Sequence, residues 1–293
     1  MSTRREFLQT LAGVGVLGAA GLQAWAEGPL AWPHPIGLQI YTVRDAYAKD
    51  PLGTLKRVRA AGYQEIELIN LDSIPADTLK GYIQQTGLKA VSGHVPLPKD
   101  DNDWNRTLGI AHTLGLSYLV IPFAVYKTAD EWKGLADKLD KLGRVCKQHG
   151  IQLGYHNHIY EFRPQGNTTG YKILLDNTDR SSLIMEMDLF WATYAHQDPL
   201  AWFRQYPGRF QMLHIKGLKK HLPPQDQNPY EFPKGKFIPF TEVGQGRINW
   251  RPIFAHVKEA GTKHIFVEQD RSDIDPFKAI AMSEKYLKNL RLS

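Results

Sequence analysis

The sequence predicts one α/β domain, residues 33–293, in which eight parallel strands close into a (β/α)8 barrel. Short apolar runs alternate with amphipathic stretches along this range, and no change of composition marks a second domain. This alternation is typical of parallel strands joined by crossover helices. An open doubly wound sheet is the competing fold, but such sheets usually carry a glycine-rich phosphate loop after the first strand. Residues 39–44 contain no glycine, which favours the barrel.

The predicted strands are short runs bounded by turn residues or by helical patterns. In chain order they are Ile36–Val43, Glu65–Ile69, Lys89–Val95, Tyr118–Pro122, Gln152–His158, Leu183–Asp188, Phe210–Lys216 and His264–Glu268. Apolar residues at helical spacing predict helices over Pro51–Ala61, Pro75–Thr86, Asn105–Leu114, Asp130–His149, Ile248–Ala260 and Pro276–Leu290. Several helices end directly before a glycine, which is the residue expected just past a helix.

The connection Gly217–Arg247, between the seventh strand and its helix, is unusually long. It contains five prolines and the aromatic residues Tyr230, Phe232, Phe237 and Phe240. Long loops in compact domains are often active-site lids, and a loop that follows a barrel strand lies on the catalytic face. We therefore expect a lid here, with a functionless insertion as the alternative.

The first 26 residues have the features of a secretory signal. Residues 3–9 resemble the twin-arginine export motif, an apolar stretch follows over residues 11–22, and residues 24–26 fit a small-x-small cleavage site. The apolar stretch is too short and too rich in glycine to favour a membrane span. The sequence thus predicts a periplasmic or secreted protein with no membrane contact after cleavage. Export of a folded protein also suits an enzyme that acquires its metal ion in the cytoplasm.

Composition excludes some classes of protein. The chain is 42% hydrophobic and 23% charged, which indicates a globular core and argues against disorder. The net charge of +6 comes from scattered basic residues, so we expect no nucleic-acid partner. A single cysteine, Cys146, excludes an intrachain disulfide and leaves histidine and carboxylates as the metal ligands.

Ionisable residues gather at the ends of the last four predicted strands, where the functional side chains of a barrel lie. These residues are His156 and His158, Glu186 and Asp188, His214 and Lys216, and Glu268 and Asp270. Because side chains alternate along a strand, each strand can direct one ligand to a common point. Two imidazoles and two carboxylates suit a catalytic divalent ion, and burying them without one would be costly. The alternative for any single histidine is a hydrogen-bonded structural residue.

Seven motifs in this order resemble the xylose isomerase-like TIM barrel family, also described as sugar phosphate isomerases/epimerases. They are residues 37–44, residues 155–158 with Glu161 and Phe162, residues 187–191, 197–199 and 214–216, residues 243–246 with Trp250, and residues 267–270. The motifs span nearly the whole of residues 33–293. The superfamily also contains inosose dehydratase, tagatose epimerase and endonuclease IV.

The resemblance implies one divalent ion held at the ends of the last four strands, most often by Glu, Asp, His and Glu. Asp188, His214 and Glu268 match the last three positions. The first glutamate falls at or near His156, so we expect His156 as the fourth ligand and His158 beside the substrate, with the reverse order left open. Manganese is the expected ion, and cobalt, zinc, iron or magnesium remain alternatives. Gly217 is a departure, since relatives commonly have an aspartate there that could orient His214.

The resemblance also implies that the ion polarises a carbonyl of a sugar while a carboxylate moves the proton on the neighbouring carbon. We expect Glu268 to be both ligand and base, and His158 to be the second acid/base. Lys216 is expected to donate to a substrate oxygen, with an ion-paired lysine as the alternative. Glu67, His94 and Trp191 are expected to line the substrate pocket.

The predicted substrate is an unphosphorylated keto-sugar or keto-glycoside, because the enzyme is exported and no loop would cradle a phosphate. Isomerisation or epimerisation and β-elimination from a 3-keto-glycoside share the same first proton abstraction, so both stay open. A non-catalytic sugar-binding barrel is a second class of function. An endonuclease IV-like phosphodiesterase is a third, which would need more metal ligands. Assembly into a homo-oligomer is left open.

Overall fold

The computed structural model describes residues 28–222, 228–232 and 239–292. The predicted signal peptide, residues 1–26, lies outside the described residues, as does Phe237 of the predicted lid. Among the residues that are described, no helix is both long and apolar enough to span a membrane.

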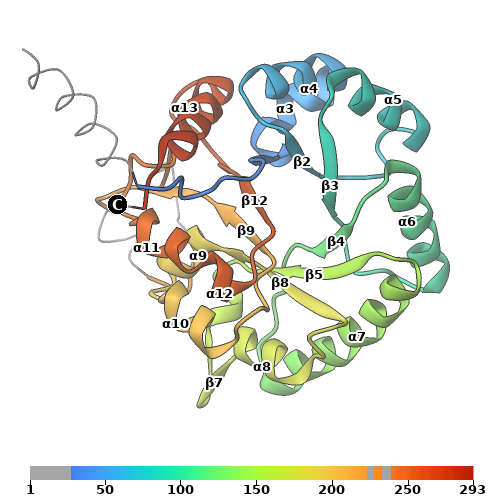
Figure 1. The fold of residues 1–293 in the computed structure, drawn as a ribbon. Coiled ribbons are helices and arrows are strands. Elements are labelled where there is room, and N and C mark those ends of the chain that lie inside the picture. Colours follow the sequence, from blue (N-terminus) through green and yellow to red (C-terminus); the bar gives the residue numbers. More distant parts are fainter. Residues whose placement is uncertain (1–27, 223–227, 233–238, 293) are drawn as a thin grey trace, which may run out of the picture.

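Eight parallel strands form a closed barrel, and Figure 1 shows the helices arranged around them. The strands are β1 (Gly37–Gln39), β2 (Glu65–Leu68), β3 (Lys89–His94), β4 (Tyr118–Ile121), β5 (Gln152–His156), β8 (Leu183–Asp188), β9 (Met212–Ile215) and β12 (His264–Val267). The barrel closes where β12 pairs with β1, with Gly37 opposite Phe266. The predicted (β/α)8 barrel is therefore confirmed.

The first strand is shorter than predicted. Ile36–Val43 was expected to be extended throughout, but β1 ends at Gln39 and Ile40–Val43 forms the 3-10 helix η1. The side-chain oxygen of Gln39 accepts a hydrogen bond from the backbone N–H of Tyr41 and so caps this turn. A side chain that satisfies a backbone donor locally competes with the strand ladder.

The helices follow the predicted order, with differences at their ends. They are α3 (Arg44–Lys49), α4 (Pro51–Ala60), α5 (Ala76–Thr86), α6 (Asp101–Leu114), α7 (Ala129–Gln148), α8 (Gly170–Asn177), α9 (Leu189–Tyr194), α10 (Pro199–Gln205), α11 (Trp250–Ala255), α12 (Val257–Ala260) and α13 (Pro276–Asn289). The predicted helix Ile248–Ala260 is interrupted at His256. The ring Nδ1–H of His256 donates a hydrogen bond to the carbonyl oxygen of Pro252. The short helices α3, α8, α9 and α10 were not predicted.

Two small hairpins lie outside the barrel sheet. β6 (Pro164–Gln165) pairs with β7 (Thr168–Thr169), and β10 (Gly217–Leu218) pairs with β11 (Phe240–Thr241). The second hairpin ties both ends of the predicted lid to the barrel. From the lid, Phe240 is buried against Phe190, with ring centroids 4.4 Å apart.

The barrel interior changes from apolar to polar along its axis. An apolar cluster fills the middle, formed by Val91, Tyr118, Val120, Ile184, Met212 and Phe266. Two residues further along their strands, Met212 is followed by His214 and Ile184 by Glu186. Successive inward-facing positions stack in layers in such barrels. The apolar layer is therefore the floor on which the polar site rests.

Candidate metal centre

Four side chains from four adjacent strands converge at the barrel mouth. His156, Asp188, His214 and Glu268 each offer a ligand atom, and these atoms all lie within 4.8 Å of one another. All four residues are buried. They come from the ends of β5, β8, β9 and β12, which neighbour one another in the barrel.

The contacts within this group leave room for a cation. His214 Nδ1 lies 2.8 Å from Glu268 Oε2 and 3.9 Å from Asp188 Oδ2, and His156 Nε2 lies 3.6 Å from the same Asp188 oxygen. Asp188 Oδ2 is buried and forms an ion pair with Lys216 Nζ at 2.9 Å. Ligands at about 2.0–2.2 Å from a divalent ion have spacings of this order. The donor set therefore fits a metal ion such as manganese or zinc.

Lys216 supplies a buried positive charge beside the carboxylates of this group. Its Nζ is buried and lies 2.9 Å from Asp188, 2.7 Å from Glu268 and 2.8 Å from Asp270. Burial disfavours the charged ammonium, but the three carboxylates outweigh it and raise the pKa of Lys216 well above its usual value. Burial also disfavours a charged His214, but the carboxylates Glu186, Glu268 and Glu67 raise its pKa well above its usual value. The carboxylates of the site therefore attract positive charge, which a divalent cation would supply. The ion-paired alternative for Lys216 is what the structure contains.

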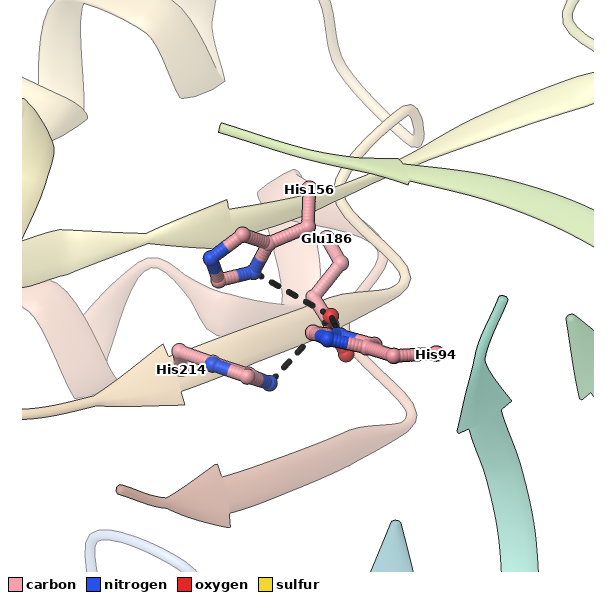
Figure 2. Close-up of side chains that lie close together, drawn as sticks. All are labelled: His94, His156, Glu186 and His214. Atoms are coloured by element: carbon pink, nitrogen blue, oxygen red, sulfur yellow. Dashed lines mark hydrogen bonds and ion pairs between the residues drawn. The ribbon is translucent and has the colours of Figure 1, made fainter. Parts of the chain in front are cut away.

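A second group lies one layer deeper and was not predicted. Figure 2 shows Glu186 among the rings of His94, His156 and His214, and their ligand atoms also lie within 4.8 Å of one another. Glu186 Oε2 is 2.9 Å from His94 Nε2, 3.3 Å from His156 Nδ1 and 3.2 Å from His214 Nε2. His156 and His214 thus belong to both groups through opposite ring nitrogens. The sequence carried one signal for this group: Glu186 is two residues before Asp188, so both side chains face the same side of β8.

Glu67 lies in the same deep layer. It was expected to line the substrate pocket, but it is not among the residues that line the cavity above this layer. It is fully buried, and its Oε1 is 2.7 Å from His214 Nε2 and 3.0 Å from His94 Nε2. Burial alone would raise the pKa of Glu67, but the charge of His94 and the hydrogen bond of His214 hold it well below its usual value. The carboxylates Glu67 and Glu186 in turn outweigh burial at His94 and raise its pKa to about 9.

A cavity of about 590 Å³ opens above the two groups. Its lining includes His94, His156, His158, Glu268, Asp270, Arg44, Arg271, Tyr41, Phe123 and Phe232. Phe232 brings the predicted lid to the cavity. Trp191 is fully buried behind this wall, with its ring 5.0 Å from Phe232 and 5.5 Å from His158. Trp191 therefore supports the cavity wall through these two rings.

His158 faces the cavity as a neutral imidazole. Burial and the nearby charge of Lys216 lower its pKa to about 3. Its Nδ1 is buried and makes no hydrogen bond with the described residues, while its backbone N–H donates to Glu161 Oε2 at 2.9 Å. His156, by contrast, points into both groups below. His156, the last residue of β5, therefore belongs to both groups of candidate ligands, whereas His158, two residues further on, belongs to neither.

Gly217 has no room for a side chain. A Cβ atom there would lie 2.2 Å from the carbonyl oxygen of Thr241, because β10 packs against β11 at this residue. An aspartate at this position would require a different hairpin. The packing of β10 against β11 therefore excludes a carboxylate side chain at position 217.

These features define a class of protein: a parallel barrel whose strand ends hold a cluster of histidines and carboxylates under an open cavity. A sequence model described as "Xylose isomerase-like TIM barrel" matches residues 55–290, so the chain belongs to this family.

The relatives include enzymes that act on sugars. The chain is similar to an inosose dehydratase of Lacticaseibacillus casei, with 25% identity over 257 residues that cover 78% of this chain and 85% of the relative. A sugar phosphate isomerase/epimerase from Parabacteroides distasonis has 26% identity and a TM-score of 0.74, over 87% of this chain and 93% of its own. The IOLI protein, solved with a bound zinc atom, shares the fold at 19% identity and a TM-score of 0.62, over 86% of this chain and 96% of its own.

Proposed function

We propose that this protein is an enzyme that uses one divalent metal ion to remove a proton next to the carbonyl of an unphosphorylated keto-sugar or keto-glycoside. Its reaction is isomerisation or epimerisation. The observation that carries the proposal is the convergence of His156, Asp188, His214 and Glu268 beneath a cavity of about 590 Å³. The relatives that act on sugars support the substrate class.

His156, Asp188, His214 and Glu268 would hold the ion, with manganese as the expected metal. The ion supplies a Lewis acid that polarises the carbonyl of the substrate. The low exposure of these residues strengthens the charge interactions among them. Rigid donors of this kind position a substrate without reorganising during the reaction.

Two side chains that line the cavity can move protons. The Glu268 carboxylate takes the proton from the carbon beside the carbonyl, and it is held in place by Lys216 at 2.7 Å. His158 is neutral and lines the cavity, so its ring can form a hydrogen bond with a substrate hydroxyl, and its role as the second acid/base stays a prediction. Donation from Lys216 to the substrate stays a prediction, although its three contacts with carboxylates favour a role in holding Asp188 and Glu268.

Dehydration or β-elimination is the second candidate reaction, and the similarity to inosose dehydratases favours it. The first step is the same abstraction by Glu268. The carbanion electrons then expel a leaving group at the β carbon, and that group takes up a proton, instead of the proton returning to carbon. The non-catalytic sugar-binding barrel and the phosphodiesterase remain the other classes.

Export through the twin-arginine route is also a proposal, and it rests on residues 1–26 of the sequence alone. It places the enzyme in the periplasm or outside the cell, where unphosphorylated sugars are the available substrates.

The test is proton exchange in deuterated water. The manganese-loaded protein is incubated with ketosugars and 3-keto-glycosides, and the filtered products are analysed by NMR. We expect deuterium at the carbon next to the carbonyl, and no exchange after the ion is removed by a chelator. A released water or aglycone together with an unsaturated ketone would identify the elimination reaction. Bound metal without exchange on any substrate would favour the sugar-binding barrel.

A further inference from the structure

Glu67 sits beneath His214 and is not among the residues that line the cavity above the two groups, so it needs a different role from substrate binding. We propose that Glu67 is a positioning residue: held by Gln39 and Ser92, it keeps the proton of His214 on Nε2 and thereby turns the Nδ1 lone pair toward Asp188 and Glu268. This inference rests on the proposed function, because it is through Nδ1 that His214 would meet the ion.

The side-chain amide of Gln39 has a fixed orientation. The backbone N–H of Tyr41 donates to the side-chain oxygen of Gln39 at 3.1 Å. The amide nitrogen of Gln39 must therefore be the atom that faces Glu67, where it donates to Oε1 at 2.7 Å. On the other carboxylate oxygen, the Ser92 hydroxyl donates to Oε2. Both oxygens of Glu67 are thus fixed as acceptors.

The orientation of the His214 ring follows from this. An ionised carboxylate accepts hydrogen bonds and cannot donate them. His214 Nε2, 2.7 Å from Glu67 Oε1, must therefore carry a proton. Nδ1 lies 2.8 Å from Glu268 Oε2, and without an ion a second proton on Nδ1 makes this contact a hydrogen bond. A divalent ion would displace that proton, so Nδ1 is the nitrogen left to bind the ion while Nε2 keeps its proton for Glu67.

The backbone explains why Glu67 reaches this place. Gln39 is opposite Glu67 in the β1–β2 pair, and Ser92 is opposite Glu67 in the β2–β3 pair. The register between β2 and β3 shifts between Ile66 and Glu67, and such irregularities redirect side chains near functional sites. Gln39, Glu67 and Ser92 are all completely buried. Glu67 thus supplies from β2 the carboxylate that Gly217 has no room to carry.

A second cation in the deep group of His94, His156, Glu186 and His214 is the rival explanation. It would need a lone pair on His214 Nε2, the atom that donates to Glu67. His214 would then have to lose both ring protons to bind one ion on each side. The number of ions per chain and the nitrogen used by His214 therefore separate the two explanations.

The first experiment measures manganese affinity in Glu67→Gln. Partners that orient a metal-binding histidine typically contribute 10–100-fold to metal affinity, so we expect a loss of about that size. Glu65→Gln is the matched control. Glu65 is on the same strand, is also buried, and holds His264 Nδ1 at 2.7 Å, but it lies at the other end of the barrel interior. We expect the control to bind manganese as the unsubstituted protein does.

Folding is checked with thermal unfolding in chelator, and Ser92→Ala serves as a milder second variant if Glu67→Gln does not fold. Ser92→Ala removes one donor to Glu67, so we expect a smaller loss of affinity. A purely structural role would lower the unfolding temperature in chelator and leave the affinity unchanged. Unchanged affinity in a folded Glu67→Gln protein would overturn the proposal.

The second experiment observes the ring directly. Long-range proton–nitrogen NMR of the zinc-loaded protein, labelled with ¹⁵N-histidine, distinguishes Nδ1 from Nε2 of His214. We expect a proton on Nε2 and a metal-shifted Nδ1, with one ion per chain. Metal on Nε2, or two ions per chain, would overturn the role of Glu67 and leave a metal enzyme. An unsubstituted protein that binds no ion would overturn the proposed function as well.

Discussion

Asp188→Asn is expected to lower manganese affinity by at least about 100-fold and to abolish proton exchange. The loss should exceed the 10–100-fold typical of residues that only orient a ligand, because a ligand oxygen is itself replaced. The substitution is conservative for the fold. Asp188 Oδ1 caps α9 by accepting the backbone N–H of Trp191 at 2.9 Å, and asparagine caps helices equally well. Isothermal titration of the metal-free protein measures the effect.

Asp198→Asn is the matched control for this substitution. Asp198 Oδ1 caps the neighbouring helix α10 by accepting the backbone N–H of Leu200 at 2.9 Å, and its side chain is exposed, away from the site. We expect unchanged manganese affinity in the control. Asp188→Asn with the affinity of the unsubstituted protein would remove Asp188 from the set of ligands.

Lys216→Met is expected to destabilise the metal-free protein by about 3–5 kcal/mol. Removing one partner of a buried ion pair leaves the other charge uncompensated, and here three carboxylates lose their common partner. Methionine retains most of the length of the side chain, so the loss of charge dominates. For a domain of this size the change corresponds to a fall of roughly 10 °C in Tm, measured by thermal unfolding in chelator.

The control is Lys133→Met, which removes an exposed lysine paired with Asp130 at 3.1 Å. Exposed pairs contribute little, so its Tm should stay close to that of the unsubstituted protein. Manganese should restore part of the stability of Lys216→Met, because the ion supplies positive charge to the same carboxylates. Equal Tm values for the Lys216→Met and unsubstituted proteins would contradict the charge balance described for this site.

The sequence was sufficient to predict the barrel and the meeting of His156, Asp188, His214 and Glu268. Both depend on periodicity: alternating strands and helices predict the closed sheet, and alternation within each strand predicts which side chains face inward. Parallel strands bring their carboxyl ends to one face, so the four residues had to lie near one another. Their roles as ligands stay predictions for the experiments above.

The depth of each side chain in the barrel could not be predicted, because it depends on the stagger between neighbouring strands. Glu67 was expected at the pocket wall and lies one layer below it, next to a register shift that no sequence pattern marks. Glu186 was recognised as sharing a face with Asp188, but its contact with His94 depends on the same stagger. The early end of β1 coincides with the hydrogen bond that the backbone N–H of Tyr41 donates to the side chain of Gln39.

Anomalous diffraction from crystals grown with manganese tests the central claim most directly. We expect one strong peak per chain, within bonding distance of His156 Nε2, Asp188 Oδ2, His214 Nδ1 and Glu268 Oε2. A peak confined to the deeper group around Glu186, or manganese bound elsewhere on the chain, would contradict it.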